Sequence, residues 1–465
     1  MACPKQHLRL PDEKRQICGT GQSQEVPVSR GQDRLDGQLQ GIDIRLHRED
    51  TGRHGRGVPV DLGQGEAAGP GQGEPVDPGQ GEAAGPGQGE AASPGQGEAG
   101  RFCPADYRLD PAVFAAKPQC RCDTLYVAGG LYGNRWAVDS LLRLIEGDPA
   151  KNARLAVNGD AHWFDTDPET FKAIEEKLSG AFLLAGNVEA ELRRRGEVGA
   201  GCGCAYPAEV EPGIVDRSNR IHRKLKATYQ GLPTLHPRFD ERPFALLAQV
   251  GGVSVAVVHG DERMLAGWGC SHEALGQAVR QHELQEWMAA HNIGVLATSH
   301  TCAPAALGMS GVGEPPQASS TRPEEAEREA SEKAEEEASK EAKEEASLPR
   351  QLSGEVPSRP FDVTEAIINN GAAGMPNFGL PGQGLVTRVS LTKHPQALYR
   401  AQLATTPPVF VEAVPLEYDQ ESFLAWFDKQ WPRLSPASVS YRTRIADGTG
   451  KSPHEAIIKG FSLLV

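Results

Sequence analysis

Residues 124–134 read Thr-Leu-Tyr-Val-Ala-Gly-Gly-Leu-Tyr-Gly-Asn, a short apolar run that stops at two glycines. Apolar residues then recur at helical spacing through residue 145. A strand, a tight loop and a helix in this order are typical of an α/β fold. We therefore expect residues 125–128 to form a strand whose carboxyl end leads into a glycine-containing loop.

Four later loops follow short apolar runs in the same way and carry side chains that bind metal ions. They read Asn158-Gly159-Asp160, Gly186-Asn187-Val188-Glu189, His259-Gly260-Asp261 and Ser299-His300-Thr301-Cys302. The runs before them predict strands at 154–157, 181–185, 253–258 and 294–297, with helices near 169–177 and 272–289. One such tripeptide alone is typical of a turn. Five such loops, each after a strand, predict that ligand-binding side chains gather at one edge of a sheet.

The second half of the chain predicts consecutive strands at 366–368, 385–391, 397–403 and 409–414, closed by a helix at 421–431. This order favours a mostly antiparallel sheet. Two sheets packed face to face with helices outside would bring all five loops to one edge. The predicted fold class is therefore α/β, a four-layer α/β/β/α sandwich of two mixed sheets.

Two segments have compositions that cannot build a core. Within residues 1–105 the tetrapeptide Gly-Gln-Gly-Glu recurs with an eight-residue period, and residues 311–360 are rich in Glu, Ala and Lys. Such segments bury too little apolar surface to offset the entropy of ordering the backbone. We expect a disordered N-terminal tail and an acidic low-complexity insert, which leaves residues 106–310 and 361–465 to form the folded domain.

The overall composition excludes several classes of partner. The formal net charge of −14 argues against nucleic acid, because a phosphate backbone is bound by Lys and Arg. No apolar run is long enough to span a membrane, so we expect no membrane partner and a cytoplasmic location. Nine cysteines are scattered along the chain without a secretory signal, which favours reduced thiols over a disulfide framework. Protein partners are not identified by any motif.

In order and spacing, the five loops resemble those of the calcineurin-like metallophosphoesterases. That family's pattern is roughly GDxHG, GDxxD, GN(H)E, an isolated His and (G)HTH. The resemblance covers most of the non-repetitive chain and implies the same four-layer fold. It also implies a hydrolase acting on ester bonds, with a small phosphomonoester or phosphodiester as substrate and divalent metal ions as cofactors.

The resemblance implies that one metal ion is bound by Asp160, Asn187, His259 and His300. Each of these residues has the chemistry of the family's ligand at its position. Two imidazoles, a carboxylate and an amide oxygen suit Mn, Fe or Zn. We expect this set to hold one divalent cation.

The set that the resemblance assigns to the other metal ion is depleted. Gly130 stands at the position of the first-loop Asp and has no side chain, and Tyr132 stands at that of the first-loop His. A tyrosine is a poor ligand unless it is deprotonated or faces a ferric ion. Cys302 would be a ligand only as a thiolate to a soft metal. A second ion would therefore occupy a looser site, completed by Cys302 or water.

The third loop also departs from the family, because Val188 stands where many members have a histidine that acts as the acid for the leaving group. The candidates for that role in this chain are His162, three positions before Asp165, and Tyr132. Of the two, His162 is the predicted catalytic residue.

Two functions follow from these observations. The first is a metal-dependent phosphoesterase with an altered, one-metal site. The alternative is a catalytically inactive protein of the same fold with a regulatory or interaction role, motivated by Gly130 and Tyr132. The helical segment 211–231 is the predicted cap, and the motif Gly201-Cys202-Gly203-Cys204 supplies two thiols and is typical of a tight turn.

Overall fold

The computed structural model describes residues 99–196, 198–310 and 362–465. The predictions for the acidic insert, and for all but the last residues of the tail, lie outside the described residues. Residues 99–105 belong to the folded part, since the Arg101 guanidinium donates to the main-chain oxygens of Pro207 and Val210. None of the described helices is both long and apolar enough to cross a bilayer.

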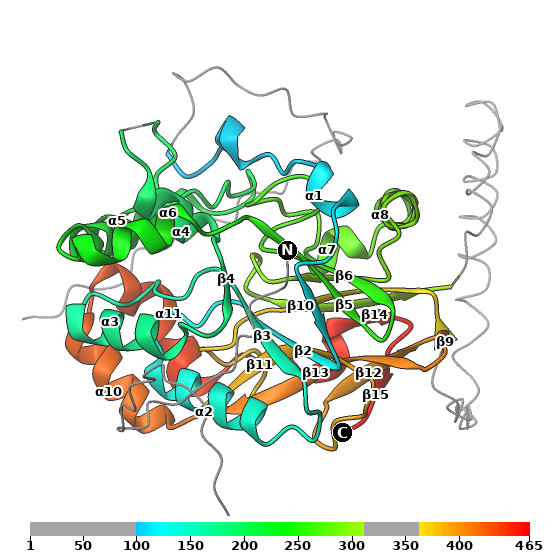
Figure 1. Ribbon diagram of the computed structural model, residues 1–465. Coiled ribbons are helices and arrows are strands. Elements are labelled where there is room, and N and C mark those ends of the chain that lie inside the picture. Colours follow the sequence, from blue (N-terminus) through cyan, green and yellow to red (C-terminus); the bar gives the residue numbers. More distant parts are fainter. Residues whose placement is uncertain (1–98, 197, 311–361) are drawn as a thin grey trace, which may run out of the picture. The chain divides into compact units, whose positions relative to one another are not determined.

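Two mixed β-sheets pack face to face (Figure 1). The seven-stranded sheet has the order β1-β5-β6-β7-β10-β8-β14 and the eight-stranded sheet has the order β15-β12-β13-β11-β2-β3-β4, with β9 beside β12. The strands of the first sheet are β1 (Cys120–Cys122), β5 (Ala245–Val250), β6 (Val253–Val258), β7 (Val295–Thr298), β8 (Pro304–Met309), β10 (Glu365–Asn370) and β14 (Ile457–Lys459). Those of the second are β2 (Thr124–Ala128), β3 (Ala153–Asn158), β4 (Phe182–Leu184), β9 (Asp362–Val363), β11 (Gln383–Ser390), β12 (Tyr399–Leu403), β13 (Val409–Glu417) and β15 (Ser462–Leu463).

Each sheet contains a parallel block next to antiparallel strands. In the eight-stranded sheet β2, β3 and β4 are parallel, whereas β11 runs antiparallel to β2 and to β13. In the seven-stranded sheet β6, β7 and β10 are parallel, whereas β5 is antiparallel to β6 and β8 is antiparallel to β10. The loops that follow β2, β3, β4, β6 and β7 therefore leave from the carboxyl ends of parallel strands.

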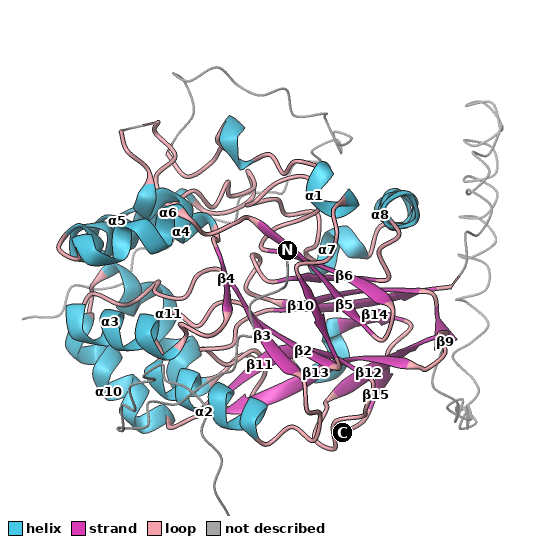
Figure 2. Cartoon of the chain, viewed as in Figure 1, coloured by secondary structure: helices cyan, strands magenta, loops and turns pink. Residues whose placement is uncertain are grey.

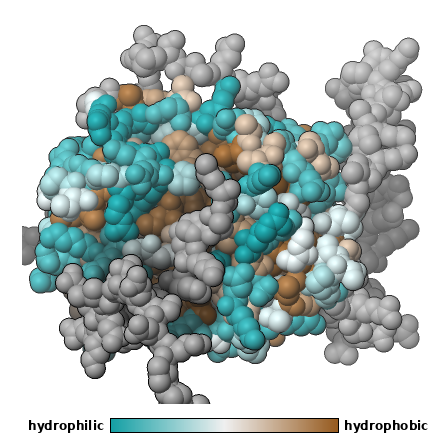
Figure 3. All heavy atoms as spheres, viewed as in Figure 1, coloured by the Kyte–Doolittle hydropathy of each residue, from teal (hydrophilic) through white to brown (hydrophobic). Residues whose placement is uncertain are grey.

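Helices cover both outer faces of the sheets (Figure 2). They are α1 (Ala112–Ala115), α2 (Arg135–Glu146), α3 (Pro168–Lys177), α4 (Asn187–Arg193), α5 (Pro212–Gln230), α6 (His236–Asp240), α7 (His272–Leu275), α8 (Ala278–His291), α10 (Gln420–Gln430) and α11 (Pro436–Asp447). Three short 3-10 turns occur at Ala105–Tyr107, Pro233–Leu235 and Pro453–Ala456. In the view of Figure 3, hydrophilic residues cover much of the helical surface and apolar residues show between them.

The alternation of side chains along the strands divides the interior into three apolar layers. On β2, Leu125 and Val127 pack between the two sheets, whereas Tyr126 packs under the helices α2, α3 and α10. On β6, Val255 points between the sheets and Val258 points toward α7 and α8. Because successive side chains of a strand point to opposite faces, both sheets are covered on both sides. The predicted four-layer α/β/β/α sandwich is confirmed.

Three local predictions differ from the structure. The strand at 366–368, predicted in the mostly antiparallel sheet of the second half, is β10 of the seven-stranded sheet, where it runs parallel to β7 and antiparallel to β8. The segment predicted as one helix at 272–289 is two helices, and α7 ends at Leu275 with Gly276 as its C-cap. The third predicted loop is shorter than expected, because helix α4 begins within it at Asn187. Gly186 is the N-cap of α4, and Glu189 occupies the third helical position, where its carboxylate accepts a hydrogen bond from the N-cap main chain.

Candidate functional site

The five loops meet at one edge and are hydrogen-bonded to one another. The first loop is joined to the second by the Gly130 N–H, which donates to the Gly159 oxygen at 3.1 Å. The fourth is joined to the fifth, because the His300 N–H donates to the His259 oxygen at 2.8 Å. The hydroxyl of Ser299 donates across to the second loop, at 2.9 Å from the main-chain oxygen of Asn158. The loops therefore form one connected unit.

Three of the loop residues have a left-handed backbone although they are not glycine. Tyr132, Asp160 and Cys302 have φ angles of 55°, 54° and 56°. Such conformations cost free energy and persist where the surrounding structure holds them. In this chain they place three side chains of interest at the edge where the loops meet.

The ring of His259 is fixed by a main-chain carbonyl. Its Nδ1 lies 2.8 Å from the oxygen of Asn158. A carbonyl oxygen can only accept, so Nδ1 carries a proton, and in the neutral ring Nε2 presents a lone pair. The side chain is 1 % exposed, so this lone pair points into the protein.

Three further polar atoms surround that lone pair. Asn187 Oδ1 lies 3.0 Å, His300 Nδ1 3.2 Å and Asp160 Oδ1 3.5 Å from His259 Nε2. All four side chains are buried, and Asp160 Oδ1 has no hydrogen-bond partner within the described part of the chain. The structure brings together the four residues that the sequence predicts as ligands of one cation.

Neighbouring carbonyls show that the facing atoms of Asn187 and His300 are also lone pairs. The amide nitrogen of Asn187 donates to a main-chain oxygen at 2.9 Å, which leaves Oδ1 toward His259. Nε2 of His300 lies 3.2 Å from another main-chain oxygen, so it carries the proton and Nδ1 carries none. With His259 in its neutral form, which is the form that ligates a metal, the four facing atoms are all acceptors.

This arrangement fits a cation better than it fits an empty core. Buried polar atoms are normally paired, and lone pairs that face one another in a low-dielectric interior repel. Two ligands that each lie about 2.1 Å from one ion are separated by about 3.0–3.4 Å. The separations of 3.0 and 3.2 Å fall in this range, and that of 3.5 Å lies just above it.

Burial sets the protonation of two of the four groups. It lowers the pKa of His300 to about 3, with a smaller contribution from the neighbouring His259, so the imidazole stays neutral, which is the form that ligates a metal. Burial raises the pKa of Asp160 to about 6, and the nearby Glu189 carboxylate raises it further while His259 lowers it. A buried carboxylate of this kind is stabilised by a cation.

In residues 99–196, 198–310 and 362–465, no group of three or more His, Cys, Asp and Glu side chains is arranged to hold a metal ion. Asp160, His259 and His300 do not by themselves form such a group, and the remaining atom that faces His259 Nε2 is the amide oxygen of Asn187.

The carboxylate of Glu189 clamps the second loop to the third. It accepts hydrogen bonds from the main-chain nitrogens of Asp160, Ala161 and Gly186, each at 2.9 Å, and it is fully buried. These contacts hold Asp160 in its left-handed conformation. The sequence contains the signal for this role, a Glu three residues after an N-cap glycine, but it does not show that the same carboxylate also reaches the second loop.

Two glycines allow the second and third loops to touch. A β-carbon at Gly159 would lie 2.5 Å from the Gly186 Cα and 2.7 Å from His259 Nδ1. A β-carbon at Gly186 would lie 2.6 Å from Asp160 Oδ1. Contacts this short do not occur between real atoms, so any larger residue at either position would push the candidate ligands apart.

The first loop is filled by an aromatic ring. A β-carbon at Gly130 would lie 2.5 Å from the ring of Tyr132, so the tyrosine occupies the space into which a longer residue at position 130 would project. The Tyr132 hydroxyl lies 2.8 Å from Cys302 Sγ, which also lies 3.4 Å from the main-chain oxygen of His300. Burial raises the pKa of both the phenol and the thiol, which favours their neutral forms. Cys302 therefore pairs with Tyr132.

His162 lies outside this group of side chains. Its Nδ1 is 3.1 Å from Asp165 Oδ2, its Nε2 is 2.9 Å from Glu175 Oε1, and its ring stacks on Phe171 at 3.7 Å between centroids. The side chain is fully buried, and both nitrogens face carboxylates. Because both nitrogens are engaged, neither is free to protonate a leaving group, and we do not propose His162 as the catalytic acid.

Aromatic rings close the space next to the four candidate ligands. The ring of Trp268 packs edge-on against His300 at 5.4 Å, and Tyr206 lies 6.0 Å from Trp268. Trp163, which the sequence places near the second loop, is a core residue with 4 % exposure. The candidate ligands are consequently separated from bulk solvent in this conformation.

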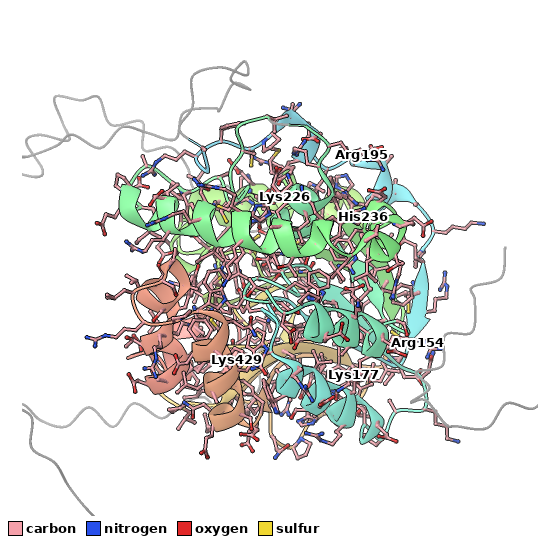
Figure 4. All side chains as sticks on the ribbon, turned by 90° about the vertical axis from the view of Figure 1, so that its left-hand side faces the viewer. Arg154, Lys177, Arg195, Lys226, His236 and Lys429 are labelled. Carbon is pink, nitrogen blue, oxygen red and sulfur yellow. The ribbon has the colours of Figure 1, made fainter. Side chains whose placement is uncertain are left out.

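Two surface cavities lie elsewhere, beyond the C-terminal end of α4. Their volumes are about 330 and 220 Å³, and both are lined by the three arginines at positions 193–195. Figure 4 shows Arg195, Lys226 and His236 on that side of the molecule. None of the four candidate ligands lines either cavity.

Comparison with known proteins yields structural likenesses only. No family model matches the chain, and no curated protein matches it. A hypothetical protein from Pyrococcus horikoshii OT3 is 11% identical, with 70% of this chain and 99% of that one covered and a TM-score of 0.41. A metallophosphoesterase from Sphaerobacter thermophilus is 16% identical over 70% of this chain and 100% of that one, with a TM-score of 0.37. Chaetomium thermophilum Vps29 is 9% identical over 64% and 95%, with a TM-score of 0.22.

Proposed function

We propose that this chain is a metal-dependent hydrolase of phosphomonoesters or phosphodiesters that works with one divalent cation. The observation that carries the proposal is the convergence of four buried lone-pair atoms from Asp160, Asn187, His259 and His300. Mn, Fe or Zn suits this mixture of imidazole nitrogen and oxygen ligands. When bound, such a cation polarises a phosphoryl oxygen and lowers the pKa of a bound water.

The chain's own residues hold the ligands in the required state. The main-chain oxygen of Asn158 keeps the proton of His259 on Nδ1, so that Nε2 faces the cation position. Glu189 fixes the main chain on both sides of that position through its three hydrogen bonds. The ring of Tyr132 fills the first-loop space, and this supports one cation rather than two.

The test is turnover together with metal binding. Purified protein is assayed with p-nitrophenyl phosphate and bis-p-nitrophenyl phosphate in the presence of manganese, and metal binding is followed by calorimetry. His259→Ala is expected to abolish both binding and turnover, whereas the control His282→Ala, a partly exposed histidine on α8, leaves both unchanged. Full activity of His259→Ala would overturn the proposal.

Two observations also favour a second function. The first-loop position is filled by Tyr132 and Cys302, and the four candidate ligands are closed off by aromatic rings. These features suit a protein of this fold that has a regulatory or interaction role without turnover. Metal binding without hydrolysis of either substrate would support this alternative. Hydrolysis that requires His259 would exclude it.

A further inference from the structure

The turn at Gly201-Cys202-Gly203-Cys204 contacts two of the four candidate ligands. The amide nitrogen of Asn187 donates to the main-chain oxygen of Cys202 at 2.9 Å and to Cys204 Sγ at 3.2 Å. Nε2 of His300 donates to the main-chain oxygen of Cys204 at 3.2 Å. One turn thus supplies the acceptors for ligands that come from two different loops.

These contacts determine which atom each ligand presents. If the amide of Asn187 were reversed, its oxygen would face the oxygen of Cys202 with no proton between them. If His300 carried its proton on Nδ1, its Nε2 would face the Cys204 oxygen as a second lone pair. Only the observed amide orientation and tautomer satisfy the turn, and both direct a lone pair at His259 Nε2.

The thiol of Cys204 is suited to accept a hydrogen bond. Cys202 and Cys204 are both free cysteines. Sγ of Cys204 lies 3.2 Å from the amide nitrogen of Asn187 and 3.9 Å from the main-chain oxygen of Cys202. A thiol sulfur is a weak acceptor, which suits the Asn187 amide.

The backbone of the turn depends on glycine, and a tryptophan fixes one of its carbonyls. Gly201 and Gly203 adopt φ angles of +61° and +71°, in the left-handed region. The indole nitrogen of Trp268 donates to the oxygen of Cys204 at 3.0 Å, beside the bond from His300. The direction of this carbonyl is therefore set on both sides.

We propose that Cys204 is a positioning residue, which orients Asn187 through its thiol and His300 through its main-chain oxygen for binding of the divalent cation. The inference rests on the proposed function as far as the cation is concerned. Groups that orient metal ligands commonly change metal affinity 10- to 100-fold when removed. In this proposal the Cys202-Gly203-Cys204 turn serves to orient the ligands, and its two cysteines neither form a disulfide nor bind a metal ion of their own.

The experiment compares Cys204→Ala, Cys204→Ser and Cys103→Ala in the full chain, with Co²⁺ as the probe. Alanine at position 204 removes the acceptor for the Asn187 amide, whereas serine replaces sulfur by another acceptor. Cys103→Ala is the control, because it removes a partly exposed thiol outside the turn. Affinity is measured by calorimetry, ligand geometry by the visible absorption of bound Co²⁺, and folding by urea denaturation.

We expect Cys204→Ala to bind Co²⁺ about 10-fold more weakly, with a changed visible spectrum, and Cys204→Ser to recover most of the affinity. Cys103→Ala should bind as the unaltered protein does. If Cys204→Ala does not fold, Trp268→Phe tests the orientation of the Cys204 carbonyl instead. This variant keeps an aromatic ring against His300 and removes only the indole N–H that donates to the carbonyl. Its affinity should also fall.

The outcomes separate this inference from the proposed function. Unchanged affinity and spectrum in Cys204→Ala, or unchanged affinity in Trp268→Phe where that variant is used, would overturn the positioning role while the metal site stands. Weakened binding in a protein that hydrolyses no phosphoester would support the positioning role and overturn the hydrolase. No Co²⁺ binding by the unaltered protein would overturn both.

Discussion

Replacing His162 by alanine should cost stability and should leave the metal site in place. The ring is fully buried and is the charged partner of Asp165 and of Glu175 at 3.1 and 2.9 Å. Glu175 would keep its ion pair with Arg242 at 2.5 Å, but Asp165 would lose its histidine, and its Oδ1 has no partner among the described residues. Removing one member of a buried ion pair costs about 3–5 kcal/mol. The retained arginine places the expected loss near the lower end, about 3 kcal/mol.

The assay is urea denaturation of the unaltered protein, of His162→Ala and of His162→Gln, which keeps a hydrogen-bond donor and should lose less. Calorimetric titration with Mn²⁺ is done at 15 °C, where the variants remain folded, and the affinity should stay within about threefold because His162 touches none of the candidate ligands. A stability loss below about 1 kcal/mol, combined with loss of turnover, would refute this reasoning and restore His162 as a catalytic residue.

Three further predictions concern the loops and the buried network. Gly130→Asp should lower the melting temperature, because the β-carbon of the new side chain would lie 2.5 Å from the Tyr132 ring. The double variant Gly130→Asp with Tyr132→His should recover part of the loss. Equal melting temperatures of the single and double variants would contradict this prediction. Glu189→Gln should lower the free energy of unfolding by about 2–3 kcal/mol, measured in urea, because an amide replaces a carboxylate that accepts three main-chain hydrogen bonds. Burial raises the pKa of Asp165 to about 6. Its ionisation therefore weakens the folded state as the pH rises from about 4 through 6, and Asp165→Asn should flatten that part of the stability curve; an unchanged curve would count against it.

The layers and the edge at which the loops meet could be predicted from local patterns. The predicted strand at 253–258 coincides with β6, and that at 154–157 lies within β3, because each apolar run is long enough to show its limits. No strand is predicted from the sequence at 245–250, which forms the buried strand β5, because the two glycines that follow it, Gly251 and Gly252, are not accompanied by a metal-binding side chain. The break between α7 and α8 occurs at Gly276 and Gln277, which the helical spacing of apolar residues does not reveal.

The candidate ligands could be predicted, but the contacts that control them could not. Asn187 and His300 stand in recognisable loops. Cys204, in the turn that orients them, is 17 residues from Asn187 and 96 residues from His300 along the chain. His162 resembles a free histidine in the sequence, because its second carboxylate, Glu175, lies 13 residues away on a helix. Spacing along the chain reveals the type of side chain available, and only folding determines which polar atoms face one another.

The most direct test of the central claim is the metal content of purified protein, measured by elemental analysis beside the His259→Ala variant. The account predicts one equivalent of Mn, Fe or Zn per chain, because four lone-pair atoms converge on one position and the Tyr132 ring fills the other. It also predicts that His259→Ala retains none. A metal-free protein that takes up no added Mn, Fe or Zn, or equal metal content in the variant, would contradict it.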